Sequence, residues 1–147
     1  MRTIMFFVKH LGSLAIGLSL SLGGGVAAAE VVAVVSAKSP VTTLNQDQIT
    51  GIFLGKMSVL PSGETVVPID QAEGSALRNE FYARFTGKSP AQIKAYWSKI
   101  IFTGRGRPPL ELPDSIAVKQ MVIENPRAIG YIDQSLVDDR VRVLLSP

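Results

Sequence analysis

The sequence predicts an α/β fold, a three-layer sandwich built on a mostly parallel sheet. Short apolar runs typical of strands occur at Val31–Val35, Thr65–Ile69, Ala128–Ile132 and Val141–Leu145. The segments between them repeat apolar residues at helical spacing, and no internal repeat follows residue 29. Strands that alternate with helices favour a sheet covered by helices on both faces, with parallel pairing predominating.

Residues 1–29 have the features of a secretory signal peptide. Arg2 and Lys9 precede an apolar run from Leu11 to Val26, and Ala27-Ala28-Ala29 follows it. The alternative is a membrane anchor. Glycines interrupt the run, and small residues end it where a peptidase would cut, which a spanning helix does not require. We therefore expect cleavage before Glu30, a periplasmic or secreted protein and no stable membrane anchor.

Removal of the signal peptide changes the size and the charge of the chain. Cutting 29 of the 147 residues leaves 118, enough for one domain over 30–147 with one hydrophobic core. The loss of Arg2 and Lys9 lowers the formal charge from +3 to +1. No long basic stretch remains, so we expect no nucleic-acid partner.

The residue types present exclude several kinds of catalysis. The chain has no cysteine, and its single histidine, His10, belongs to the predicted signal peptide. This excludes disulfides, Ser-His-Asp and Cys-His nucleophiles and an ordinary zinc site from residues 30–147. The only adjacent acidic pair is Asp138-Asp139, in a predicted turn. We expect a protein that is not an enzyme and has no metal or cofactor.

The first helix after the initial strand is short. Ser39-Pro40 ends the strand, and Asn45 is a typical N-cap for a helix over 46–54, whose apolar residues lie at helical spacing. Gly55 is a typical C-terminal stop. A loop over 56–64, rich in turn residues, connects this helix to the next strand.

The helix that follows the central strand is predicted over Ser75–Phe85. Its apolar side carries Leu77, Phe81, Tyr82 and Phe85, and Thr86-Gly87 ends it. The same spacing leaves Arg78, Asn79 and Glu80 largely to solvent.

The start of this helix has two interpretations. Gly74 and Ser75 form the junction, and Ser75 at the N-cap leaves the amides of Ala76, Leu77 and Arg78 without intrahelical partners. Such amides make a natural anion site. The alternative is that Ser75 simply caps the helix.

The next helix begins at Ser89-Pro90 and ends near Phe102. Gly87-Lys88-Ser89 is no phosphate-binding Walker loop, because that motif requires glycine at the position of Tyr82. Trp97 lies in a wide apolar stripe, which favours a core position over a ligand-stacking surface. The loop over 103–109 contains Arg105 and Arg107, which indicate either an anion clamp or a solvated loop held by prolines.

The last predicted helix begins at Asp114 or Ser115 and ends at Asn125-Pro126. Strands over 128–132 and 141–145 complete the domain.

Three stretches resemble the substrate-binding proteins of phosphate ABC importers. They are Ile52-Phe53-Leu54-Gly55-Lys56, Val66 to Asp70 leading into Glu73-Gly74-Ser75, and Asn125 to Tyr131. The resemblance extends over nearly all of residues 30–147 and implies one lobe of a type II periplasmic binding protein. Members of that family generally have two lobes, whereas 118 residues are enough for one, so the opposing wall of a closing cleft is not expected.

The resemblance also implies where a ligand would bind. The family binds phosphate with an arginine before the turn and with Ser-Gly-Thr at the helix start. This chain has Gln71 and Ser75-Ala76-Leu77 there, so only Ser75 carries over directly, and Arg78 is a candidate substitute charge. The expected ligand-binding residues are Gln71, Gly74, Ser75, Ala76, Leu77, Arg78, Arg105 and Arg107.

We therefore expect an exported solute-binding-protein-like domain that binds phosphate or a related oxyanion, for ABC-type uptake or sensing. Its expected partners are the oxyanion and an ABC permease, a sensor or a second subunit. The alternative is a periplasmic protein-interaction module that keeps the lobe fold without binding a ligand. A carboxylate-dependent hydrolase is a third class, for which no catalytic arrangement is evident in the sequence.

Overall fold

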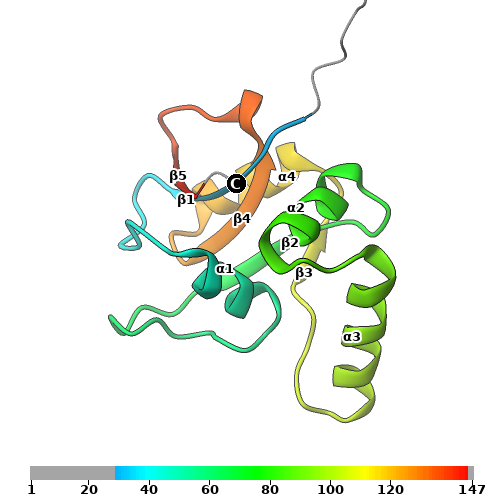
Figure 1. The fold of residues 1–147 in the computed structure, drawn as a ribbon. Coiled ribbons are helices and arrows are strands. Elements are labelled where there is room, and N and C mark those ends of the chain that lie inside the picture. Colours follow the sequence, from blue (N-terminus) through cyan, green and yellow to red (C-terminus); the bar gives the residue numbers. More distant parts are fainter. Residues whose placement is uncertain (1–28, 146–147) are drawn as a thin grey trace, which may run out of the picture.

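The computed structural model describes residues 29–145. Residues 1–28, most of the predicted signal peptide, lie outside the described part of the chain. The elements in order are β1 (Val31–Ser36), α1 (Gln46–Phe53), β2 (Val67–Gln71), α2 (Ala76–Thr86), α3 (Pro90–Phe102), β3 (Leu110–Leu112), α4 (Ser115–Glu124), β4 (Ala128–Asp133), the 3₁₀ turn η1 (Gln134–Leu136) and β5 (Val141–Leu145) (Figure 1).

The five strands of residues 29–145 form one sheet in the order β3-β2-β4-β1-β5. The predicted α/β class is confirmed, but the sheet is mixed rather than mostly parallel. β2 pairs in parallel with β3 and β4, whereas β1 runs antiparallel to both β4 and β5. The apolar run of β1 predicts burial on both faces, which the structure confirms, but such a run carries no information about strand direction.

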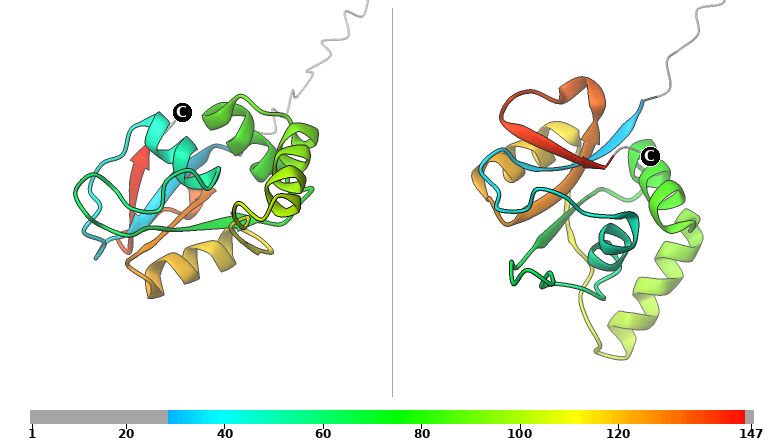
Figure 2. Two further views of the ribbon diagram at one scale, coloured as in Figure 1. Left: turned by 90° about the horizontal axis from the view of Figure 1, so that it is seen from below. Right: turned by 60° about the vertical axis from the view of Figure 1, so that its left-hand side comes forward.

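Helices cover both faces of the sheet, as the predicted three-layer arrangement requires (Figure 2). α4 covers one face, where Val118 and Val122 pack against strand residues that include Val32 and Ile132. α1 and α2 cover the other face and form a second, larger core cluster. Trp97 of α3 packs into the larger core with 5% of its surface exposed, so its predicted core position is confirmed.

The predicted helix starts are confirmed by their caps. Asn45 and Ser89 each form a capping box, and Ser89 is followed by Pro90 in the first turn. The side chains of Ser75 and Asp114 accept hydrogen bonds from the amides of Arg78 and Ala117.

One strand differs from the sequence expectation. β3, which the sequence pattern does not predict, has only three residues and lies between the loop over 103–109 and α4. It is an edge strand, and its pairing with β2 begins at Ile69 and Leu110. Among residues 29–145, no helix is long and apolar enough to cross a bilayer.

Candidate functional site

The candidate site lies where two parallel strands end and two helices begin. β2 ends at Gln71 and leads into α2, and the neighbouring β3 ends at Leu112 and leads into α4. Ligands of open α/β sheets bind outside the carboxyl ends of parallel strands, where helix N-termini also gather. The topology therefore brings the starts of α2 and α4 together at the carboxyl-terminal end of β2 and β3.

Gln71 connects these two helix starts. Its Nε2 donates to the hydroxyl of Ser115 at 3.0 Å and to the backbone oxygen of Tyr131 at 3.1 Å. Its Oε1 accepts a hydrogen bond from the hydroxyl of Ser75 at 3.2 Å. Only 2% of Gln71 is exposed, so this side chain positions Ser75 and Ser115 from beneath.

The start of α2 offers unpaired backbone donors. The Ser75 hydroxyl accepts from the Arg78 amide at 3.3 Å, so Ser75 caps the helix as one of the two interpretations predicts. The amides of Ala76 and Leu77 have no hydrogen-bond partner among the described residues. Gly74 adopts φ +90°, a conformation that side chains rarely allow, and so permits the tight turn into the helix.

Arg78 is not left to solvent, so that part of the helix-face prediction is wrong. Its guanidinium Nη1 donates to Glu111 Oε1 at 2.9 Å, and Nη2 lies 3.7 Å from Asp70 Oδ2. The whole residue is 9% exposed. Burial opposes the charge of Arg78, but the Asp70 carboxylate, with smaller contributions from Tyr82 and Glu111, outweighs it and raises the pKa of Arg78.

Asp70 is the buried carboxylate behind the site. It is 1% exposed and accepts hydrogen bonds from the hydroxyls of Tyr82 (2.6 Å) and Tyr131 and from the amide of Gln71 (2.8 Å). Burial, together with the Asp70 charge and the hydrogen bond to it, raises the pKa of both tyrosines well above the usual value. The buried carboxylate of Asp70 is therefore satisfied by three hydrogen-bond donors.

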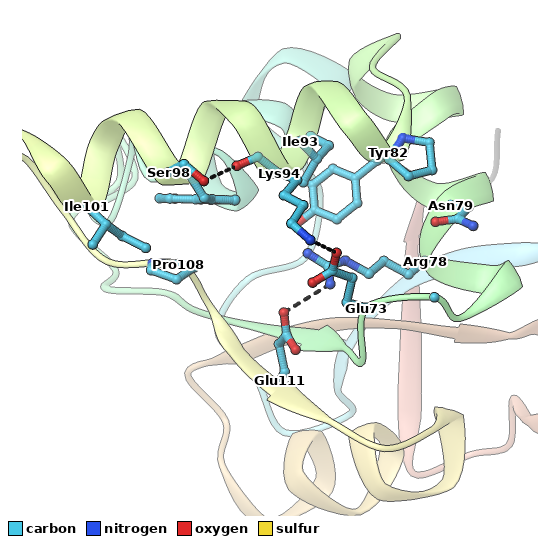
Figure 3. Close-up of a pocket in the computed structure, with 13 residues that line it drawn as sticks. Glu73, Arg78, Asn79, Tyr82, Ile93, Lys94, Ser98, Ile101, Pro108 and Glu111 are labelled. Atoms are coloured by element: carbon cyan, nitrogen blue, oxygen red, sulfur yellow. Dashed lines mark hydrogen bonds and ion pairs between the residues drawn. The ribbon is translucent and has the colours of Figure 1, made fainter.

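A pocket opens beside the start of α2, with a cavity volume of about 240 Å³. Figure 3 shows its two ends: Arg78, Glu73 and Lys94 lie at one, and Ile101 and Pro108 at the other. Lys94 Nζ pairs with Glu73 Oε1 at 3.2 Å at this charged end of the pocket (Figure 3). The pocket therefore has a charged end beside α2 and an apolar end beside the last turn of α3.

The predicted site residues fall into two groups. Gln71 and residues 74–78 lie together at the carboxyl-terminal end of β2, and Gly74 and Arg78 also line the pocket. Arg105 and Arg107 are exposed in the loop after α3, outside the pocket lining, and neither forms an ion pair with any described residue. Their role as an anion clamp stays a prediction.

Sequence reasoning missed Asp70, Glu111 and Ser115 as members of this site. Asp70 had a usable signal, because a lone acidic residue at the end of an apolar strand indicates a buried polar contact. Glu111 and Ser115 lack a local signal, since they reach the site only through the pairing of β3 with β2. Among residues 29–145, no group of three or more acidic or histidine side chains could hold a metal ion.

No protein-family model and no curated protein sequence matches the chain. Solved structures do. The chain is similar to an ABC-type phosphate transport receptor from Vibrio cholerae, with a TM-score of 0.60 and 20% identity. It is also similar to a phosphate ABC transporter substrate-binding protein with bound phosphate from Clostridium perfringens (TM-score 0.63, 24% identity) and to PstS from Borrelia burgdorferi (TM-score 0.58, 10% identity).

These comparisons cover 79% of this chain but only 45%, 44% and 46% of the three receptor chains, in the same order. The chain thus spans less than half the length of the receptors that it matches. At this level of identity the likeness concerns the fold. The chain therefore has the fold of one part of a phosphate-receptor structure, in agreement with the predicted resemblance to a single lobe.

Proposed function

We propose that residues 30–147 form an exported, non-enzymatic solute-binding-protein-like domain that binds phosphate or a related oxyanion at the start of α2. The observation that carries the proposal is the pair of unpartnered amides at Ala76 and Leu77 beside the Ser75 hydroxyl. Backbone amides at a helix N-terminus stabilise a bound oxyanion through hydrogen bonds and the helix dipole. The shared fold with a receptor that holds phosphate supports the same choice of ligand.

The expected affinity is modest, because the polar groups of the site are already engaged. The Ser75 hydroxyl donates to Gln71, so it must turn to donate to an anion. Arg78 is paired with Glu111 and lies close to Asp70, so an anion competes with two carboxylates for its charge. An anion on this open edge also stays partly hydrated. We expect a dissociation constant above about 1 µM unless a second subunit covers the site.

The biological setting that follows is uptake or sensing outside the cytoplasm. In this proposal residues 1–29 are a cleaved signal peptide, and the domain presents its ligand to an ABC permease, a sensor or a second subunit. The open position of the start of α2 supports such a partner, because a protein docked there would cover the anion and exclude water from it.

A specific observation also favours the second candidate, an interaction module without a ligand. Gln71 and Ser75 satisfy each other, and Arg78 and Glu111 do the same. A site whose side chains are satisfied internally keeps its shape without an anion. The fold would then serve only to present a surface to a partner protein.

Titration calorimetry separates the two functions. Residues 30–147 are titrated with inorganic phosphate and, separately, with sulfate, at low ionic strength. Oxyanion binding predicts saturable heat between micromolar and millimolar anion. An absence of heat up to millimolar concentrations of both anions would exclude the oxyanion site and leave the interaction module.

A further inference from the structure

The pocket beside α2 is larger than an inorganic oxyanion requires. Its volume of about 240 Å³ exceeds the roughly 150 Å³ of an apolar cavity that binds benzene. The lining beyond the charged end is mainly apolar and includes Trp97 together with Ile93, Ile101 and Pro108, which Figure 3 labels. Small-molecule sites typically combine such an apolar wall with a few polar groups that fix the orientation of the ligand.

Trp97 forms part of the apolar wall. It lines the pocket and is 95% buried, and its indole nitrogen, which has no acceptor among the described residues, is itself enclosed by protein atoms. The pocket therefore meets Trp97 through the apolar part of the indole.

Arg78 supplies the charged contact at the other end. A guanidinium has five N–H donors, and Glu111 takes one of them. The Glu111 side chain is 44% exposed on a three-residue edge strand, so it has room to turn toward solvent when an anion arrives. Asp70, buried beneath, keeps Arg78 in place during that exchange.

We propose that the pocket binds an oxyanion that carries an apolar substituent about the size of a benzene ring, such as an organophosphonate. The anionic head lies between Gly74 and Arg78, and the substituent packs against Trp97 and Ile101. This inference rests on the proposed oxyanion site at the start of α2, of which Gly74 and Arg78 line the pocket, and names the ligand class of that site. It also predicts that inorganic phosphate alone binds weakly there, because phosphate gains nothing from the apolar wall.

Three matched probes test the ligand class. Phenylphosphonate has both the head and the ring, methylphosphonate retains the head, and benzyl alcohol retains the ring without the charge. Binding is followed by calorimetry and by the fluorescence of Trp97, the only tryptophan in the chain. We expect phenylphosphonate to bind about tenfold more tightly than methylphosphonate, equivalent to about 1.4 kcal/mol, and to change the fluorescence. Benzyl alcohol should not bind in the same concentration range.

Two neighbouring substitutions test the location. Ile101→Ser removes an apolar side chain that lines the pocket, whereas Phe102→Ser changes a residue that is 92% exposed and outside the lining. We expect the first to weaken phenylphosphonate binding several-fold with methylphosphonate unaffected, and the second to leave both affinities unchanged. Equal effects of the two substitutions on phenylphosphonate would overturn the location.

The outcomes also separate this inference from the proposed function. If inorganic phosphate and methylphosphonate bind as tightly as phenylphosphonate, the inference is wrong and the oxyanion site stands. If benzyl alcohol binds as tightly as phenylphosphonate, the pocket is a purely apolar site and the inference is again wrong. If none of the three oxyanions binds, both proposals are wrong.

Discussion

The hydroxyl of Tyr82 donates a 2.6 Å hydrogen bond to the carboxylate of Asp70, and both groups are buried beneath the candidate site. Removing this donor leaves a buried charge with one partner fewer. Tyr82→Phe should therefore lower the free energy of unfolding at pH 7 by about 1.5–3 kcal/mol. Tyr96→Phe is the control, because the Tyr96 hydroxyl donates to a neutral carbonyl, and it should cost about 1 kcal/mol.

The raised pKa of Tyr82 predicts that the protein loses stability at alkaline pH. The pKa of Tyr82 is raised in the folded state, so its contribution is complete below the unfolded pKa of about 10 and is lost as the pH rises above it. Tyr131 behaves in the same way. Each tyrosine should lower the free energy of unfolding by about 1.4 kcal/mol per pH unit above pH 10. Urea unfolding at pH 8 and 11 measures this decrease. In Tyr82→Phe only Tyr131 remains, so the part of the decrease that is due to the two tyrosines should be halved. Equal slopes in wild type and variant would contradict the argument.

The larger core depends on aromatic packing that α2 and α3 bring to the sheet. Phe81 is fully buried and stacks on Tyr131 with ring centroids 4.0 Å apart. Phe81→Ala and Trp97→Ala should each lower the free energy of unfolding by about 3–5 kcal/mol, measured from denaturant midpoints. Phe102→Ala, on the exposed end of α3, should stay within about 0.5 kcal/mol of wild type. A loss below about 1 kcal/mol for Trp97→Ala would mean that the indole does not support the core.

Close packing of α4 on the sheet predicts a fourth stability effect. A Cβ atom added at Gly130 of β4 would lie 2.5 Å from Val118 Cγ1 and 3.2 Å from Val122 Cγ2. Gly130→Ala should therefore cost about 1–3 kcal/mol in thermal or denaturant unfolding. Gly51→Ala is the matched control, because its new Cβ meets only Met57, at an ordinary 3.5 Å. Because Gly51 lies in the middle of α1, Gly51→Ala should raise the free energy of unfolding by about 0.5–1 kcal/mol. A neutral Gly130→Ala would show that α4 can move away from the sheet.

The sequence predicts those parts of the fold whose signals are local. Capping residues and apolar periodicity place the starts of α1, α2, α3 and α4, because both effects act within a few residues. The direction of β1 has no local signal, and neither has β3, a three-residue edge strand that exists only through its pairing with β2.

The residues of the candidate site also divide into those with a local sequence signal and those placed by tertiary structure. Ser75 as an N-cap follows from its neighbours in sequence. The burial of Arg78 does not, because its partner Glu111 lies 33 residues away and reaches it through the β2–β3 pairing. A residue on the predicted polar side of a helix is exposed only if no other element covers that side, and this depends on tertiary structure.

Export predicts a specific mature N-terminus. Ala27 and Ala29 provide the small side chains that signal peptidase requires, so the exported protein should begin at Glu30. Intact-mass measurement of the protein secreted by a bacterial host checks this directly. Detection of a membrane-bound species that retains residues 1–29 would mean that these residues are a membrane anchor and not a cleaved signal peptide.

The two N-cap serines of α2 and α3 provide the sharpest test of the oxyanion site. Ser75 and Ser89 each cap a helix by accepting from an amide three residues later, so Ser75→Ala and Ser89→Ala should each cost about 0.5–2 kcal/mol of stability. Only Ser75 lies beside the unpaired amides of Ala76 and Leu77 and beside Gln71. Calorimetry with phosphate should therefore show weaker binding, by several-fold, for Ser75→Ala and an unchanged affinity for Ser89→Ala. If phosphate binds both variants as it binds wild type, the anion lies elsewhere and the start of α2 is only a capped helix.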